Sequence, residues 1–279
     1  MDSTLTTTDA LQLAVREWPC ADARGSVLIV HGLGEHCGRY ARLAAQLNTW
    51  GWAAVGYDHR GHGASQGERG AIASPEALLA DLALLIDSMR ATHSGPLVLL
   101  GHSLGGLVAA RFCAPVLAGE APAWRRQVEA LVLSSPALDL GMNRFQKLLL
   151  ALLGPLAPQL ALNNGLNPEW VSRDPAVVKA YVDDPLVHNR VTPRLVQFIV
   201  DGGKLVRERA AAWAVPTLLL YAASDRCVAP AGSAAFAARA PKAMLTAHEF
   251  APLYHEIFNE PERAEVFGVL GSWLARRAH

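Results

Sequence analysis

Three residues of this chain have the types and the order that attack on a carbonyl carbon requires. Ser103 lies in the pattern G-H-S-L-G at residues 101–105, and Asp225 and His255 follow it later in the chain. A serine hydroxyl becomes an effective nucleophile when a histidine takes its proton, and a carboxylate orients that histidine. We therefore expect Ser103 to be the nucleophile, His255 the base and Asp225 its orienting acid.

Each of these residues, taken singly, has an ordinary alternative. A G-x-S-x-G pattern arises by chance, an aspartate after a strand is often a turn residue, and a loop histidine is often incidental. The combination favours the catalytic interpretation, because serine, acid and histidine come in the chain order typical of a nucleophile on a sharp strand-to-helix turn.

The elements that must position these residues are short apolar runs that alternate with helical patterns. Three of the runs lead directly to Ser103, Asp225 and His255. Runs that are apolar on both faces suit a sheet covered by helices on both sides. We therefore predict an α/β fold with a mostly parallel, doubly wound sheet flanked by helices. The predicted strands are Val27–Val30, Ala53–Tyr57, Leu97–Leu100, Leu131–Ser135, Thr217–Ala222 and Met244–Phe250.

Capping patterns indicate where helices begin. Ser74-Pro75 predicts an N-cap followed by a proline in the first turn, with a helix that runs to about Arg90. Thr192-Pro193 predicts a second start, and Asn259–Pro261 a third. The last helix carries one core-facing stripe, formed by Val266, Phe267, Leu270, Trp273 and Leu274.

Residues 139–209 interrupt the alternation of strands and helices. They contain no convincing strand, only helical patterns separated by prolines, and they are too many for a plain connection. We predict a core of residues 1–138 and 210–279, with residues 139–209 inserted as a helical cap over one edge of the sheet.

A second motif near the N-terminus supplies the remaining part of acyl-transfer chemistry. The sequence HGLGEH at residues 31–36 follows the first predicted strand. Acyl transfer needs backbone N–H groups aimed at the developing oxyanion. We expect these donors to be the amides of Leu33 and of Leu104, the residue after the nucleophile.

Two cofactor interpretations of these motifs fail on spacing. Gly32 and Gly34 after a strand resemble a dinucleotide-binding turn, with Asp58 at the end of the next strand, but the third glycine is one position late and Glu35 would face the pyrophosphate. The histidine pairs His31/His36 and His59/His62 lack a carboxylate or cysteine at supporting spacing. We expect no cofactor and no metal.

Composition excludes several classes of partner and compartment. The 279 residues are 51% hydrophobic and 18% charged, with 25 Lys+Arg against 25 Asp+Glu, so no basic surplus favours nucleic acid. The N-terminus MDSTLTTTDA is not typical of a secretory signal. We interpret the four cysteines, which show no pairing pattern, as free thiols in a reducing compartment, and expect a cytoplasmic protein. They are Cys20, Cys37, Cys113 and Cys227.

Six motifs together resemble the monoacylglycerol lipase/lysophospholipase branch of the α/β-hydrolase superfamily. They run from residue 31 to about residue 261 and read HGLGEHCGRY, YDHRGHGASQG, GHSLGG, DPLVH, ASDRCVAP and YHEIFNEP. The resemblance implies an α/β-hydrolase fold and the same assignment of Ser103, Asp225 and His255, with Leu33 and Leu104 as oxyanion donors.

The resemblance also implies a substrate pocket under the cap. Glu35 and Arg39 match positions near the alcohol end of the substrate, although a salt bridge is an equally good interpretation of that pair. The apolar segment Leu148–Leu162, including Leu149 and Leu152, is interpreted either as a wall facing the acyl chain or as packing within the cap. An exposed part of it would contact lipid surfaces.

The sequence therefore predicts a cytoplasmic serine hydrolase, peripheral at membranes if the cap docks, that cleaves esters of fatty acyl chains. A monoacylglycerol is the first expected substrate. A lysophospholipase or a short- or medium-chain carboxylesterase is the alternative, and a non-catalytic binding protein of the same fold is the distant one. The expected partner is a small lipid ester, not a nucleic acid.

Overall fold

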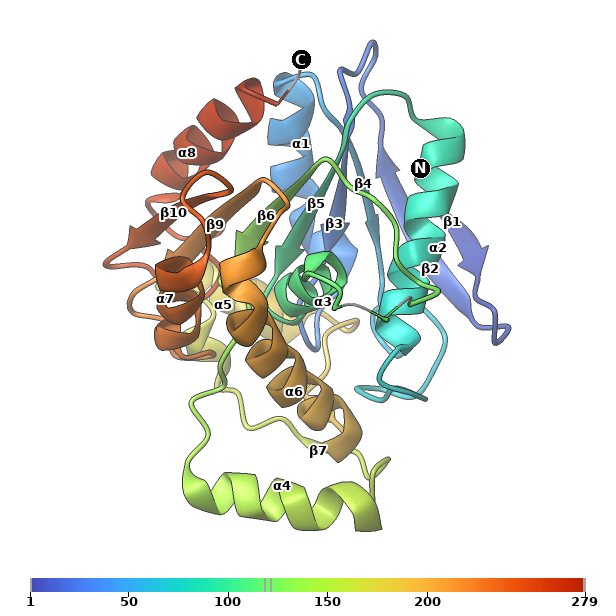
Figure 1. Ribbon diagram of the computed structural model, residues 1–279, viewed down its shortest axis with the longest axis vertical. Coiled ribbons are helices and arrows are strands. Elements are labelled where there is room, and N and C mark those ends of the chain that lie inside the picture. Colours follow the sequence, from blue (N-terminus) through green and yellow to red (C-terminus); the bar gives the residue numbers. More distant parts are fainter. Residues whose placement is uncertain (1, 118, 121, 278–279) are drawn as a thin grey trace.

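The computed structural model describes residues 2–117, 119–120 and 122–277, and its centre is an eight-stranded sheet in the order β1-β2-β4-β3-β5-β6-β9-β10 (Figure 1). In this sheet the strands β4, β3, β5, β6, β9 and β10 run parallel to their neighbours. At one edge, β1 pairs antiparallel with β2, and β2 pairs antiparallel with β4. The strands are β1 (Asp2–Thr6), β2 (Gln12–Trp18), β3 (Ser26–Val30), β4 (Ala53–Tyr57), β5 (Leu97–His102), β6 (Ala130–Ser134), β7 (Leu162–Asn163), β8 (Arg190–Val191), β9 (Thr217–Ala222) and β10 (Leu245–Phe250).

Helices cover both faces of this sheet, as predicted. Along β3, Val27 and Ile29 pack into the core on the side of α1 and α8, and Leu28 and Val30 into the core on the side of α2, α3, α6 and α7. Burial on both faces explains why the strand is apolar throughout rather than alternating. The helices are α1 (Ala41–Thr49), α2 (Ala77–Thr92), α3 (Leu104–Cys113), α4 (Arg144–Leu156), α5 (Pro175–Asp183), α6 (Pro193–Arg209), α7 (Pro230–Arg239) and α8 (Arg263–Ala275). Short 3₁₀ turns span Cys37–Tyr40, Pro168–Trp170 and Ala210–Ala212.

The six predicted strands are confirmed close to their expected bounds, with two differences at the sheet edges. β1 and β2 were not predicted, because their sequences DSTLT and QLAVREW carry the polar residues of an outer, half-exposed hairpin. β10 was expected to be covered on both sides, but as the opposite edge strand it is largely exposed apart from Phe250.

The capping predictions succeed where the side chain bonds the helix. The Thr192 hydroxyl accepts a hydrogen bond from the Leu195 N–H, and Pro193 occupies the first turn of α6. The prediction at Ser74 was wrong, because α2 begins at Ala77 and the Ser74 carbonyl instead accepts from the Ala77 N–H in a preceding turn. The last helix starts at Arg263, slightly after its predicted start, and buries most of its predicted stripe.

The chain between β6 and β9 contains the helices α4, α5 and α6 and lies at the end of the sheet where the parallel strands finish (Figure 1). It also contains the two-residue strands β7 and β8, which pair antiparallel and which the sequence did not predict. α6 packs on α3 of the core, and α4 packs on α6 as the helix farthest from the sheet (Figure 1). Among the described residues, no helix combines the length and apolar character needed to cross a bilayer.

Candidate active site

The turn between β5 and α3 holds Ser103 in a strained conformation. Its φ of 52° and ψ of −117° lie in a region that residues with a side chain rarely adopt. Small neighbours make the turn possible, because a Cβ on Gly105 would lie 2.0 Å from the Val30 carbonyl oxygen, and one on Gly101 2.4 Å from that of Gly105. The sequence pattern thus lifts Ser103 out of the sheet while α3 stays in contact with β3.

Asp225 and His255 are brought together at the ends of β9 and β10. Asp225 Oδ2 lies 2.7 Å from His255 Nδ1, and its Oδ1 accepts hydrogen bonds from the amides of Cys227 and Val228 at 2.8 and 3.1 Å. Burial opposes protonation of His255, but the Asp225 charge and hydrogen bond outweigh it, and the pKa of His255 is raised above its usual range. The carboxylate therefore fixes the tautomer with Nε2 free for chemistry.

His102, the residue before Ser103, lies next to this pair. The rings of His102 and His255 are 4.6 Å apart, while the described residues show no hydrogen bond between the Ser103 hydroxyl and His255. Catalytic hydrogen bonds are often long before substrate binds. Burial and the neighbouring His255 lower the pKa of His102 to about 4, so His102 is neutral near pH 7.

A cavity of about 360 Å³ opens beside Ser103 and receives residues from the core and from the α4–α6 region. Leu33 and Leu104 line it, and the backbone amide of neither residue donates a hydrogen bond within the described part of the chain. The Leu104 amide is free because it is the first of α3, where helix N–H groups lack partners. Two unpaired N–H groups beside a serine are the arrangement that stabilises an oxyanion.

Glu35 and Arg39 are not among the residues that line this cavity; they form a buried ionic network. Arg39 bonds Glu35 at 2.8 Å and both oxygens of Glu256 at 2.6 and 2.8 Å, and Glu35 also accepts from the Gly32 amide and the Tyr40 hydroxyl at 2.6 Å each. Burial opposes ionisation of Glu35, yet the Arg39 charge and these donors hold its pKa at about 2. The salt-bridge interpretation of the pair therefore describes the structure.

The same network argues against dinucleotide binding at this turn. The Gly32 amide, which would face a pyrophosphate, is occupied by the Glu35 carboxylate. Asp58, the candidate ribose ligand, instead accepts from the backbone amides of Cys37 and Ala64 at 2.8 Å each.

Two hydrogen bonds tie the motif DPLVH to the HGLGEH loop, a role that the sequence did not reveal. His36 Nδ1 accepts from the Gly38 amide, so Nε2 carries the proton that it donates to Asp184 at 2.9 Å. The His188 amide donates to the Gly34 carbonyl at 2.8 Å. These contacts fix the α4–α6 region against the loop that holds Leu33.

The other histidines of the pairs noted in the sequence form a buried cluster. The His31 ring lies 4.4 Å from that of His59 and 5.4 Å from that of His62, and His31 Nε2 accepts from the His59 amide. Burial lowers the pKa of all three, which keeps them neutral.

Among the described residues, the three side chains close enough to share a metal ion are Asp225, Cys227 and His255. Their chemistry does not fit such a role. Asp225 and His255 are bonded to each other, and burial raises the pKa of the Cys227 thiol, which opposes formation of the thiolate that a metal would need. The four cysteines are free thiols, as predicted.

Leu149 and Leu152 do not line the Ser103 cavity. They are 44% and 55% exposed on the outer side of α4, and the α4 residue at the cavity is Gln146. The helical spacing of residues 148–162 correctly indicated an apolar face, but Leu149 and Leu152 of that face are exposed. The expectation that these two residues contact the acyl chain does not describe this structure.

Comparison with known proteins shows which family and which solved structures the whole chain resembles. A family model described as serine aminopeptidase S33 matches residues 21–262. The chain is 34% identical to a monoacylglycerol lipase of Mycolicibacterium smegmatis, over 92% of this chain and 90% of that one. It is 32% identical to phospholipase YtpA of Bacillus subtilis, over 86% and 91% of the two chains. The crystal structure of Paleococcus ferrophilus monoacylglycerol lipase superposes with a TM-score of 0.84 at 34% identity, covering 95% of this chain and 99% of that one.

The Arg39 network generates a stability prediction. Arg39→Met leaves Glu35 and Glu256 buried without their cation and should lower the free energy of unfolding by about 3–5 kcal/mol at pH 7. Glu35 has a folded-state pKa of about 2, below the usual value of about 4.3, so its stabilisation is complete above the usual pKa and is lost as pH falls toward 2. The difference between wild type and variant should therefore shrink between pH 4.5 and 2, measured by urea unfolding. An equal difference at pH 7 and pH 3 would contradict this account.

Proposed function

Because the chain belongs to the serine aminopeptidase S33 family of the α/β-hydrolase superfamily, we propose that it cleaves the carboxylic ester of a monoacylglycerol through an acyl-enzyme on Ser103. The observation that carries this proposal is the 2.7 Å contact between Asp225 and His255, together with the strained turn at Ser103, whose neighbour His102 lies with its ring 4.6 Å from that of His255. Serine ester hydrolysis requires a histidine base held by a carboxylate and a serine hydroxyl that the base can reach.

The proposed reaction has two halves that use the same groups. His255 takes the proton of Ser103 as its oxygen attacks the ester carbonyl, and the tetrahedral oxyanion accepts hydrogen bonds from the Leu33 and Leu104 amides. The alcohol leaves with the proton from His255, and a water molecule then repeats the sequence on the acyl-enzyme. Asp225 stabilises the imidazolium that forms in each half.

The cavity supports an acyl ester as substrate. Much of its wall is apolar, with Met142 from the segment before α4 and Val196 and Ile199 from α6. The relatives from Mycolicibacterium smegmatis and Paleococcus ferrophilus carry the name monoacylglycerol lipase. An apolar wall facing the nucleophile favours a fatty acyl chain over a charged or peptide substrate.

Arg226 favours a lysophospholipid as the second candidate substrate. Arg226 lines the cavity, and its guanidinium stacks 4.6 Å from the Tyr254 ring centre and makes no ion pair within the described residues. A free arginine at a cavity wall suits a phosphate group. The relative named phospholipase YtpA points in the same direction.

An ester series tests the reaction and its substrate together. We expect hydrolysis of 1- and 2-monoacylglycerols with medium or long acyl chains, and a fall of about 10⁴-fold in kcat for Ser103→Ala, because the nucleophile is lost. Ser88→Ala, on the outer side of α2, should retain wild-type rates and serves as the matched control.

Each arm of this series has a distinct contrary result. Undiminished activity in Ser103→Ala would remove the mechanism, and a rate maximum at acetyl esters would remove the lipase assignment. Faster cleavage of lysophosphatidylcholine, lost in Arg226→Gln, would select the second candidate. Cleavage of aminoacyl p-nitroanilides in place of esters would make the enzyme an aminopeptidase.

The pH dependence follows from His255, which must be neutral to act as base. Its pKa is raised above the usual value of about 6.5, so kcat/KM should fall as pH drops through that higher pKa. Asp225→Asn removes the charge that raises the pKa and should move the acid limb to lower pH, besides lowering the rate. Profiles of kcat/KM from pH 5 to 9 with a p-nitrophenyl ester measure the position of the acid limb and the rate. An acid limb at the same pH in wild type and Asp225→Asn would contradict the proposed pairing.

We propose in addition that α4 contacts lipid surfaces. Its exposed face consists of side chains at helical spacing that are 44–81% exposed, an unusual concentration of apolar surface, beside the cations Arg144 and Lys147. This face would place the cavity entrance against the membrane that contains the substrate. The residues of the exposed face are Phe145, Leu148, Leu149, Leu152 and Leu156.

Vesicle binding tests this contact. The double variant Phe145→Ser/Leu156→Ser should bind phosphatidylglycerol-containing vesicles about tenfold or more weakly, since two apolar side chains no longer insert. Its hydrolysis of a water-soluble ester should be unchanged. Val182→Ser, which removes a 61% exposed side chain on α5 outside this face, is the control. Equal sedimentation of wild type and double variant with vesicles would refute the contact.

A further inference from the structure

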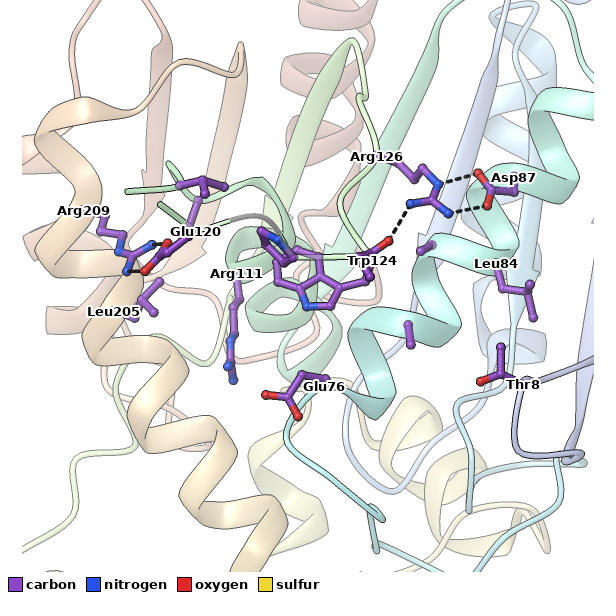
Figure 2. Close-up of a pocket in the computed structure, with 16 residues that line it drawn as sticks. Thr8, Glu76, Leu84, Asp87, Arg111, Glu120, Trp124, Arg126, Leu205 and Arg209 are labelled. Atoms are coloured by element: carbon purple, nitrogen blue, oxygen red, sulfur yellow. Dashed lines mark hydrogen bonds and ion pairs between the residues drawn. The ribbon is translucent and has the colours of Figure 1, made fainter. Parts of the chain in front are cut away.

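A second and larger cavity, of about 770 Å³, lies away from Ser103 between α2, α3 and α6 (Figure 2). None of its lining residues belongs to the wall of the Ser103 cavity. Its walls are largely apolar and include Ala83 and Leu84 of α2, Leu205 of α6 and the indole of Trp124. A concave apolar site of this size with a few polar groups has the properties of a small-molecule site.

The polar group that stands out in this cavity is Arg111, on the helix that begins directly after Ser103. Its guanidinium makes no hydrogen bond or ion pair within the described residues and lies 4.8 Å from the centre of the Phe198 ring. Burial lowers the pKa of Arg111, which means that its charge is partly stripped of water. A desolvated cation gains most from an anionic partner.

The two other arginines of the cavity already have such partners. Arg126 is paired with Asp87 at 2.7 Å and Arg209 with Glu120 at 2.8 Å, as the dashed lines in Figure 2 show. These pairs leave Arg111 as the cation available to a ligand among the described lining residues.

Two carboxylates act on Arg111 without bonding to it. Glu76 is exposed at the rim of the cavity, next to the start of α2, and Asp201 of α6 accepts a hydrogen bond from Gln197 at 2.8 Å. The exposed Glu76 carboxylate forms no hydrogen bond or ion pair with the guanidinium in the described part of the chain. It also gives the cavity a negative charge whose removal should strengthen the binding of an anion.

We propose that this cavity is a second ligand site, which binds a fatty acid with its carboxylate on Arg111 and its acyl chain along the apolar walls. The cation of Arg111 selects a ligand with a negative charge. The apolar wall selects a ligand with an apolar chain, and it includes Ala83, Leu84, Trp124 and Leu205. A fatty acid is also the product of the proposed ester hydrolysis. The enzyme's own reaction as the source of this ligand therefore rests on the proposed function. The binding itself requires no turnover.

Calorimetric titration with dodecanoate, below its micellar concentration, tests the site. Wild type should bind it, and Arg111→Gln should weaken binding by about tenfold or more because a charge-assisted hydrogen bond is lost. Arg111→Lys, which keeps the charge, should retain most of the affinity. Glu76→Gln should bind more tightly than wild type, a gain that no structural damage would produce. Arg42→Gln, which removes an exposed arginine of α1, is the control for net charge.

Neutral dodecan-1-ol provides the second arm, because it should bind equally to wild type and Arg111→Gln. Circular dichroism and thermal melting establish that each variant is folded. Dodecanoate affinity that is unchanged in both Arg111→Gln and Glu76→Gln, or no binding to wild type, would overturn the proposal. These titrations are independent of the ester series, so loss of either result leaves the other interpretable.

Discussion

The contact on which the site depends is the buried ion pair of Arg39 with Glu35 and Glu256. Glu35 belongs to the loop after β3 and holds the Gly32 amide, while Glu256 is the neighbour of His255 in the loop after β10. One guanidinium therefore joins the loop that presents Leu33 to the loop that presents His255. Since these loops lie more than 200 residues apart in the sequence, the pairing needs the whole sheet to bring them together.

The topology of the sheet brings these loops together. Parallel strands finish at one edge, so the residues after β3, β5, β9 and β10 converge there. The strained turn at Ser103 adds the third requirement, because it ends β5 at the nucleophile and starts α3 at Leu104, whose amide donates no hydrogen bond within the described residues. Backbone strain is tolerated at such a turn when close packing fixes it from all sides, which the glycines against β3 make possible.

Much of the fold was predictable because it depends on local patterns. A short run of apolar residues predicts a strand that is buried on both faces, such as Thr217–Ala222. The neighbouring residues Thr192 and Pro193 likewise predict the start of α6. Other parts of the fold could not be predicted in this way, because they depend on tertiary contacts more than on composition. They are the edge strands, the two-residue strands and the start of α2. For the site, chain order indicated Ser103, Asp225 and His255, whereas the outward direction of Leu149 and the contact of Asp184 with His36 depend on how α4–α6 fold back.

The central claim is that Ser103 is the nucleophile, and covalent trapping tests it most directly. The folded protein would be treated with a p-nitrophenyl alkylphosphonate, which mimics the tetrahedral intermediate, and then digested for peptide mass spectrometry. The account predicts one phosphonate per chain on the peptide that contains Ser103, formed far more slowly in Asp225→Asn. An adduct on another residue, or none on a folded chain, would contradict it.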